Sequence, residues 1–157
     1  MKITLILVGK TVKSFLKDGE AEFDKRLKHY VKINEIVIPE LKNASKFSEL
    51  EIKKKEGDLI LGKISTSDEL VLLDDKGLHQ TSLQMSKWIE KFQIGGCKNL
   101  VFVVGGAYGF SEEVYSRAQH KLSLSKLTFS HQMVRMIFKE QLYRSYTILK
   151  GEPYHHQ

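Results

Sequence analysis

The chain has 157 residues, of which 41% are hydrophobic and 28% are charged, a composition that suits one domain with a core and excludes a disordered chain. The one long apolar run, residues 3–8, is too short to span a bilayer, and no basic and apolar leader precedes it. The single cysteine, Cys97, excludes an internal disulfide and a thiolate-rich metal site. We therefore expect a cytoplasmic protein with no metal and no membrane partner.

Two segments with helical spacing alternate with three strands in the first half of the chain. Residues 2–9 are expected to form a buried strand, and apolar or small residues four apart predict a helix over residues 15–27. A second strand is expected at residues 33–38. A Ser and a Glu three residues apart predict a capping box for a lysine-rich helix over residues 48–64. A third strand is expected at residues 69–74.

The second half continues the alternation. A Thr-Gln capping box predicts a helix over residues 81–94, followed by a buried fourth strand at residues 99–104. Another helix is expected to begin after Ser111, and a last helix is expected at residues 132–149, ended by Gly and Pro. This order predicts an α/β layer fold with a mainly parallel sheet in a single domain, residues 1–157.

Positive charge gathers toward the carboxyl end. The formal net charge is +6, and residues 121–157 contain six Lys and Arg against two Glu, so four of the six net charges fall there. A polyanion such as RNA would be attracted by this bias. The alternative is a solvated basic surface without a partner.

A buried strand runs directly into a glycine-rich loop in residues 100–111. Gly105, Gly106 and Gly109 follow the predicted strand, where α/β sheets bind ligands and where glycine lets a ligand approach the backbone. The spacing excludes a dinucleotide-binding G-x-G-x-x-G motif, because its first glycine position is Val104. A tight turn without a ligand is the alternative.

A second segment, residues 122–129, alternates apolar and small polar side chains without a turn signal. It is either a short edge strand or a loop whose backbone groups and apolar side chains suit an adenine ring. Asp74 and Asp75 follow the third strand. We expect a solvated turn there rather than a catalytic pair, because adjacent side chains usually point apart.

The last helix and the tail after it carry candidate RNA-contacting residues. Glu140 is placed to pair with Arg144 four residues later, whereas Arg135 and Lys139 have no such partner and are expected to bind phosphates. Residues 153–155, Pro-Tyr-His, follow the helix. A histidine that titrates near neutral pH and a tyrosine that can stack suit RNA chemistry.

Four motifs and the amino end together resemble one known family. They are VVGGAYG at residues 103–109, LSLSKLTFSH at 122–131, EQLYRS at 140–145, PYH at 153–155 and MKITLILVGK at 1–10. In this order and spacing the chain resembles the RlmH-type SPOUT methyltransferases over essentially its whole length. The resemblance implies a single-domain SPOUT fold with helices on both faces of the sheet and a carboxy-terminal trefoil knot, which periodicity does not predict.

The resemblance also implies an activity. It is S-adenosylmethionine-dependent methylation of N3 of a pseudouridine in large-subunit (23S) ribosomal RNA by a homodimer in which the partner subunit completes the active site. The net charge of only +6 predicts weak, salt-sensitive phosphate contacts, so we expect the substrate to be the assembled ribosome rather than naked RNA. The cofactor-binding positions that carry over are Leu73, Gly105, Gly106, Leu124, Ser125, Lys126, Leu127, Thr128 and Phe129. Ser130 stands where the family usually has proline, and we expect this to loosen the cofactor loop and weaken affinity somewhat. A side chain added at Gly106 is expected to block the cofactor while the fold survives.

Methylation of an imide nitrogen requires loss of its proton, so a nearby acceptor would help. The candidates among residues of the resemblance are His155, Tyr154 and His131, with Arg144 better suited to hold a phosphate or the carbonyl oxygens of the base. Apolar residues of the last helix are candidates for the dimer interface or, alternatively, for the core: Met133, Ile137 and Tyr146.

Two rival functions fit the same residues. One is a non-catalytic RNA-binding module in which the glycine loop is only a turn, and the other is a small flavodoxin-like nucleotide binder. The module would bind RNA but not S-adenosylmethionine, and the nucleotide binder would have little affinity for RNA.

Overall fold

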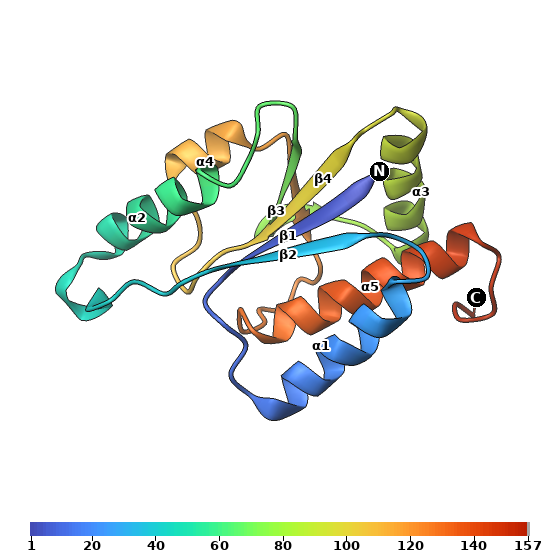
Figure 1. Cartoon of the computed structure of the whole chain (residues 1–157), viewed down its shortest axis with the longest axis horizontal. Coiled ribbons are helices and arrows are strands. Elements are labelled where there is room, and N and C mark those ends of the chain that lie inside the picture. Colours follow the sequence, from blue (N-terminus) through green and yellow to red (C-terminus); the bar gives the residue numbers. More distant parts are fainter. Residues whose placement is uncertain (157) are drawn as a thin grey trace.

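All strands of the protein join one sheet. The computed structural model describes residues 1–156, and its strands are β1 (Lys2–Val8), β2 (Ile33–Ile38), β3 (Glu69–His79), β4 (Asn99–Val104) and β5 (His120–Ser123). Their order is β2-β1-β4-β3-β5, and every neighbouring pair is parallel (Figure 1). The predicted α/β fold with a parallel sheet is confirmed. The trefoil knot stays a prediction.

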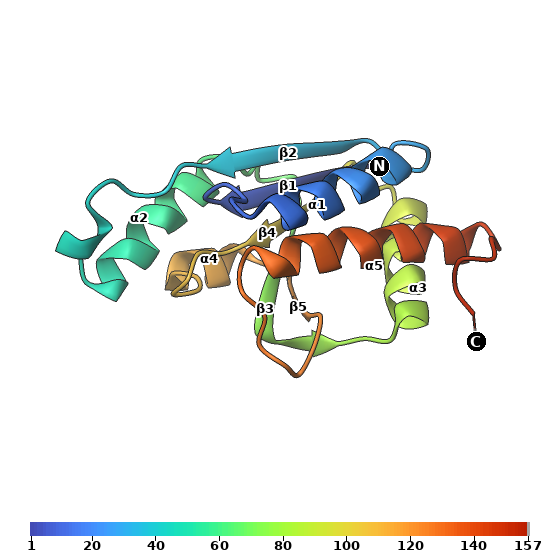
Figure 2. The same cartoon turned by 90° about the horizontal axis from the view of Figure 1, so that it is seen from below.

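Helices cover both faces of the sheet, as predicted (Figure 1 and Figure 2). One face carries α1 (Ser14–Leu27), α3 (Ser82–Ile94) and α5 (Met133–Leu149), and the other carries α2 (Glu49–Leu61) and α4 (Glu112–Arg117). A short 3-10 turn, Ala44–Lys46, precedes α2. No helix within residues 1–156 combines the length and the apolar character that a membrane crossing would need.

The pleat of the strands explains the two layers. In β1, Ile3, Leu5 and Leu7 belong to the core on the α1, α3 and α5 side, and Ile6 and Val8 belong to the core on the other side. Successive side chains of a strand point to opposite faces. Since both faces of the sheet are covered, the sequence of β1 is an apolar run rather than an alternation of apolar and polar residues.

The predicted caps form as expected. The side chain of Ser48 accepts a hydrogen bond from the backbone of Glu51, and Thr81 makes the same bond to Gln84, so both capping boxes are complete. Ser111 caps α4. The helix expected to reach residue 64 ends at Leu61 instead, with Gly62 as its cap.

Two strand predictions are corrected by the structure. β3 continues past residue 74 to His79 through an irregularity between Leu73 and Leu78, and beyond it pairs again with β5. A Cβ on Gly77 would lie 2.6 Å from the backbone of Leu122, so only glycine allows this close approach. β5 agrees with the edge-strand alternative only at residues 122 and 123, because the strand begins at His120 and residues 124–129 form a loop.

Arg135 and Lys139 are buried, which overturns the expectation that they bind phosphates. The guanidinium of Arg135 donates to the carbonyls of Val8 at 2.6 Å and Gly9 at 3.0 Å, at the end of β1. Burial lowers the pKa of Arg135, yet these acceptors hold the side chain inside the fold. Its partners lie more than a hundred residues away in sequence, where a search for helical pairs does not look.

Lys139 joins three elements through carboxylates. Its Nζ lies 3.0 Å from Glu20 and 2.9 Å from Asp24 on α1, and 2.8 Å from Glu35 on β2. Burial opposes the charge, but the hydrogen bonds to Glu35 and Asp24 outweigh it and raise the pKa of Lys139. The last helix is thereby tied to α1 and to the sheet edge.

The dimer-interface candidates on α5 divide between two environments. Tyr146 is 4% exposed and belongs to the core, so the core alternative holds for it. Met133 and Ile137 are half-buried, and an interface role for them stays a prediction.

We expect Lys139→Met to lower the free energy of unfolding by about 3 kcal/mol, because it leaves the buried Glu20 and its neighbours without their counter-ion. Urea unfolding measures this. Lys150→Met is the matched control, because Lys150 is an exposed cation at the end of the same helix and should change stability by less than about 0.5 kcal/mol. Wild-type stability of Lys139→Met would contradict the role assigned to this cluster.

Candidate functional site

Parallel pairing brings three segments together at one end of the sheet. β3 is the neighbour of both β4 and β5, so the carboxyl ends of β4 and β5 lie beside the irregular part of β3. Residues 105–110 follow β4, residues 124–131 follow β5, and residues 74–77 are the irregular part of β3 itself. A cavity of about 530 Å³ lies between these segments. Its size is typical of a site for a small molecule or cofactor.

Most of the residues proposed for cofactor binding line this cavity. Eight of the nine do so: Leu73, Gly105, Gly106, Leu124, Ser125, Leu127, Thr128 and Phe129. Lys126 is exposed on the same loop and does not line the cavity. His131, the candidate acceptor just before α5, does line it.

The loop after β5 exposes apolar side chains at the cavity. Leu127 is 74% exposed and Phe129 is 37% exposed, although both line the cavity. Hydrogen bonds within the loop hold it: Ser123 Oγ donates to the carbonyl of Ser125, and the backbone N–H of Leu127 donates to Ser125 Oγ, both at 2.9 Å. A ligand with an apolar ring face would find a shaped wall here.

Ser130 is anchored to the helix that follows. Its hydroxyl accepts a hydrogen bond from the backbone N–H of Met133 at 3.2 Å, and its carbonyl accepts one from Val134 at 3.0 Å. A proline at this position could not offer the hydroxyl. The serine therefore holds the end of the loop in a way that opposes the loosening expected from the sequence.

The two glycines after β4 lie close against neighbouring side chains. A Cβ on Gly105 would lie 3.0 Å from the ring of Phe110, and a Cβ on Gly106 would lie 2.6 Å from Glu56 Oε2. A side chain at Gly106 would thus meet the carboxylate of Glu56, the flexible end of a side chain, which would have to shift. The expectation that a side chain at Gly106 blocks the cofactor while the fold survives stays a prediction.

The two acidic residues expected in a turn face the cavity from within β3, a placement that the sequence did not predict. Asp74 and Asp75 both line it, in the irregular part of β3. Tyr115 donates its hydroxyl to Asp74, and the N–H of Lys76 donates to the same carboxylate at 2.8 Å. Burial and this hydrogen bond raise the pKa of Tyr115, so its phenol stays protonated. The only signal in the sequence was the Asp-Asp-Lys-Gly turn, and bulges of this kind are common beside active sites.

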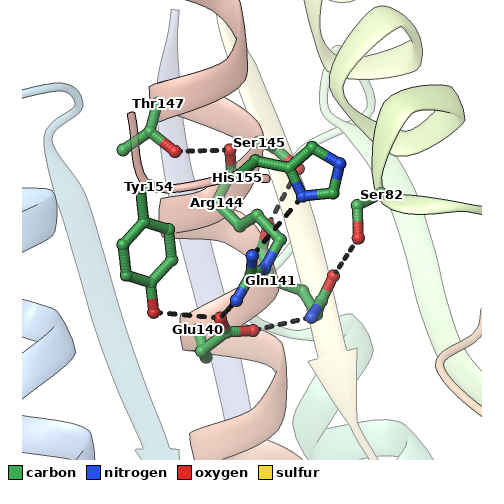
Figure 3. A network of polar contacts seen from close by, with 8 residues as sticks. All are labelled: Ser82, Glu140, Gln141, Arg144, Ser145, Thr147, Tyr154 and His155. Atoms are coloured by element: carbon green, nitrogen blue, oxygen red, sulfur yellow. Dashed lines mark hydrogen bonds and ion pairs between the residues drawn. The ribbon is translucent and has the colours of Figure 1, made fainter. Parts of the chain in front are cut away.

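The other catalytic candidates form a separate cluster at the far end of α5 (Figure 3). Tyr154 donates to Glu140 at 3.1 Å, and Arg144 Nε donates to the same carboxylate at 3.0 Å. The guanidinium of Arg144 also lies 4.6 Å from the centre of the Tyr154 ring. His155 Nδ1 lies 3.4 Å from Arg144 Nη1.

Tyr154 and His155, in the tail after α5, are therefore packed against the helix and are not frayed. Gly151 turns the chain with φ +68°, and the ring of Tyr154 packs edge-on against Tyr143, with centroids 4.7 Å apart. Burial and the charge of Glu140 raise the pKa of Tyr154. Tyr154 is consequently a proton donor at neutral pH, and His155 is the member of the cluster suited to accept a proton.

The cavity and the tail cluster are separated within one chain. His131 and Val134 line the cavity, whereas Arg144 belongs to the tail cluster. The ten residues from Val134 to Arg144 advance about 15 Å along the helix axis. A single chain therefore does not bring His131, Tyr154 and His155 around one substrate.

Comparison with known proteins decides the family. A family model described as "Predicted SPOUT methyltransferase" matches residues 1–155. The chain belongs to the SPOUT methyltransferase family. This confirms the resemblance inferred from the four motifs.

Full-length relatives agree with this membership of the SPOUT family. The chain is 53% identical to a protein of Parabacteroides distasonis, 51% identical to one of Flavobacterium johnsoniae and 46% identical to one of Bacteroides fragilis. Each similarity covers 100% of this chain and 100% of the relative, and each relative is named "Ribosomal RNA large subunit methyltransferase H".

In residues 1–156, no group of three or more His, Cys, Asp and Glu side chains is placed to hold a metal ion.

Proposed function

We propose that this SPOUT methyltransferase transfers the methyl group of S-adenosylmethionine to N3 of a pseudouridine in large-subunit ribosomal RNA, on the assembled ribosome. The observation that carries the proposal is the cavity that the motifs resembling RlmH-type enzymes enclose at the ends of β4 and β5, beside the irregular part of β3. The names of the full-length relatives supply the class of RNA. A non-catalytic RNA-binding module has no use for such a cavity.

The residues of the cavity fit the proposed cofactor. Adenosine needs apolar faces and backbone hydrogen bonds at the ring edge, and the loop with Leu124, Leu127 and Phe129 offers both. Gly105 and Gly106 line the cavity without side chains, so a ligand could approach their backbone closely. S-adenosylmethionine, when bound, supplies an electrophilic methyl group on a sulfonium.

The protein must align the attacking nitrogen with that methyl group and remove the N3 proton. Alignment of two reactants in a closed site is worth about 7–11 kcal/mol of the barrier. A positioned proton acceptor adds about 10²- to 10⁴-fold in rate. Among the candidates, His155 is suited to accept the proton, Tyr154 to donate a hydrogen bond to the base, and Arg144 to hold a carbonyl oxygen or phosphate.

These roles require a second copy of the chain. The cavity of one chain lies at the opposite end of α5 from its own tail cluster, so a symmetric dimer with antiparallel α5 helices would place the partner's tail at each cavity. Met133 and Ile137, half-buried at the cavity end of α5, are candidates for such an interface. Sedimentation that shows an active monomer at micromolar concentration would contradict the dimer.

The charge distribution favours a structured ribosomal substrate over naked RNA. Three of the six cations in residues 121–157 are occupied, because Arg135 and Lys139 are buried and Arg144 is paired with Glu140. Contacts with phosphates alone should then give weak and salt-sensitive binding. The shape of the ribosomal surface has to provide the remaining affinity.

Methyl transfer to intact ribosomes, separated subunits and deproteinised ribosomal RNA tests the proposal directly. We expect the methyl group on N3 of a pseudouridine of the large-subunit RNA, with intact ribosomes as the best substrate. Equal rates on all three substrates would contradict the ribosomal preference, and a methyl group on another atom would contradict the reaction.

Leu127→Ser should weaken S-adenosylmethionine binding about five- to tenfold, because a bound cofactor would cover an exposed leucine, and partial burial is worth about 1 kcal/mol. Isothermal titration calorimetry measures the affinity. Leu50→Ser is the matched control, because Leu50 is equally exposed, at 73%, and does not line the cavity. An equal affinity for both variants would remove the loop from the cofactor site.

Removal of residues 153–157 should lower methyl transfer by about two or more orders of magnitude, the scale of a lost acid–base group. Cofactor affinity should stay within roughly twofold, since cavity residues are untouched. Removal of residues 156–157 alone, which retains Tyr154 and His155, is the control and should keep full activity. A truncated enzyme with the full rate would leave His131 as the remaining candidate acceptor.

A further inference from the structure

A buried carboxylate lies directly behind the wall of the cofactor cavity. Glu56, on α2, is 8% exposed, and its Oε2 lies 2.6 Å from the point where a Cβ on Gly106 would stand. Gly106 lines the cavity. One glycine, without a side chain, is therefore the wall between this carboxylate and whatever occupies the cavity.

Glu56 has no counter-ion within the described part of the chain. None of the ion pairs among residues 1–156 involves it, whereas Glu20, buried to a similar degree, is neutralised by Lys139. Burial raises the pKa of Glu56, and the negative charge of Glu40 adds to this effect. A buried carboxylate is normally paired, so a cation beside Glu56 would relieve an unfavourable state of the free protein.

The other carboxylates near the cavity lack this combination of burial and missing partner. Asp74 accepts hydrogen bonds from Tyr115 and from the backbone of Lys76. Asp75 is exposed, so water and salt screen its charge. Of these three carboxylates, Glu56 is the one that is buried and has no ion-pair partner within residues 1–156.

We propose that Glu56 is a specificity-determining residue that favours the cationic methyl donor over its neutral product. This inference rests on the proposed function, which makes S-adenosylmethionine the occupant of the cavity. The sulfonium of the donor is positive, and after methyl transfer the sulfur is a neutral thioether. The attraction of the Glu56 carboxylate exists for the donor and disappears for the product, which promotes exchange of one for the other.

The test compares the affinities of S-adenosylmethionine and S-adenosylhomocysteine by calorimetry. Glu56→Gln keeps the shape and removes the charge, and should weaken the donor about tenfold while the product changes by less than about twofold. Asp58→Asn removes a carboxylate from the same helix at an exposed position and should leave both affinities unchanged. An equal loss for both ligands would make Glu56 a support of the glycine loop only, and no loss would remove it from the site.

A measurement on the wild-type protein covers the case in which Glu56→Gln fails to fold. Burial raises the pKa of Glu56 and a cation beside it lowers this pKa, so at mildly acidic pH, where the carboxyl is partly protonated, donor binding should release more protons than product binding. Calorimetry in buffers of different ionisation enthalpy counts these protons. Equal proton release for the two ligands would overturn the inference.

The failure of this inference can be told apart from the failure of the proposed function. A wild-type protein that binds neither ligand contradicts the cofactor assignment itself, and Glu56 falls with it. A protein that binds both ligands and methylates ribosomes, with the same affinity ratio in wild type and Glu56→Gln, contradicts only the role of Glu56.

Discussion

The parallel pairing of β3 with β4 and β5 is the constraint on which the functional site depends. It places the ends of β4 and β5 beside the irregular part of β3, so that segments around residues 74, 106 and 127 enclose a common cavity. The pairing with β5 depends in turn on Gly77, because any side chain there would collide with the backbone of β5. The loop of small and apolar residues after β5 forms a wall of this cavity because a four-residue strand holds its start.

Two buried cations, Arg135 and Lys139, fix the position of the last helix. Arg135 and Lys139 connect α5 to β1, to α1 and to β2, so the last helix lies fixed across the sheet. A fixed helix keeps its two ends apart, with the cavity at one end and the cluster of Glu140, Tyr154 and His155 at the other. The chemistry proposed for this protein needs both ends at one substrate, and the proposed dimer with antiparallel α5 helices would provide that arrangement.

Local patterns predicted most of the fold, and long-range partners account for what they did not predict. Apolar runs and the capping box at Ser48 need only neighbouring residues, and both were predicted correctly. β5 is too short to show a period, and its pairing depends on Gly77. Lys139 looked free because its partner on β2 is 104 residues away. The sequence does not distinguish Glu56 from the other charged residues of its lysine-rich helix, since only the fold places it against Gly106.

Mixed dimers test the central claim, that the cavity of one copy works with the tail of another. One subunit lacks residues 153–157, and the other carries Leu127→Asp and Phe129→Asp in the cavity loop. Each variant alone should be inactive, whereas an equal mixture that exchanges subunits should regain roughly a quarter of the wild-type methyl transfer, since half the dimers contain one intact composite site. A mixture that forms mixed dimers and stays inactive would contradict the claim.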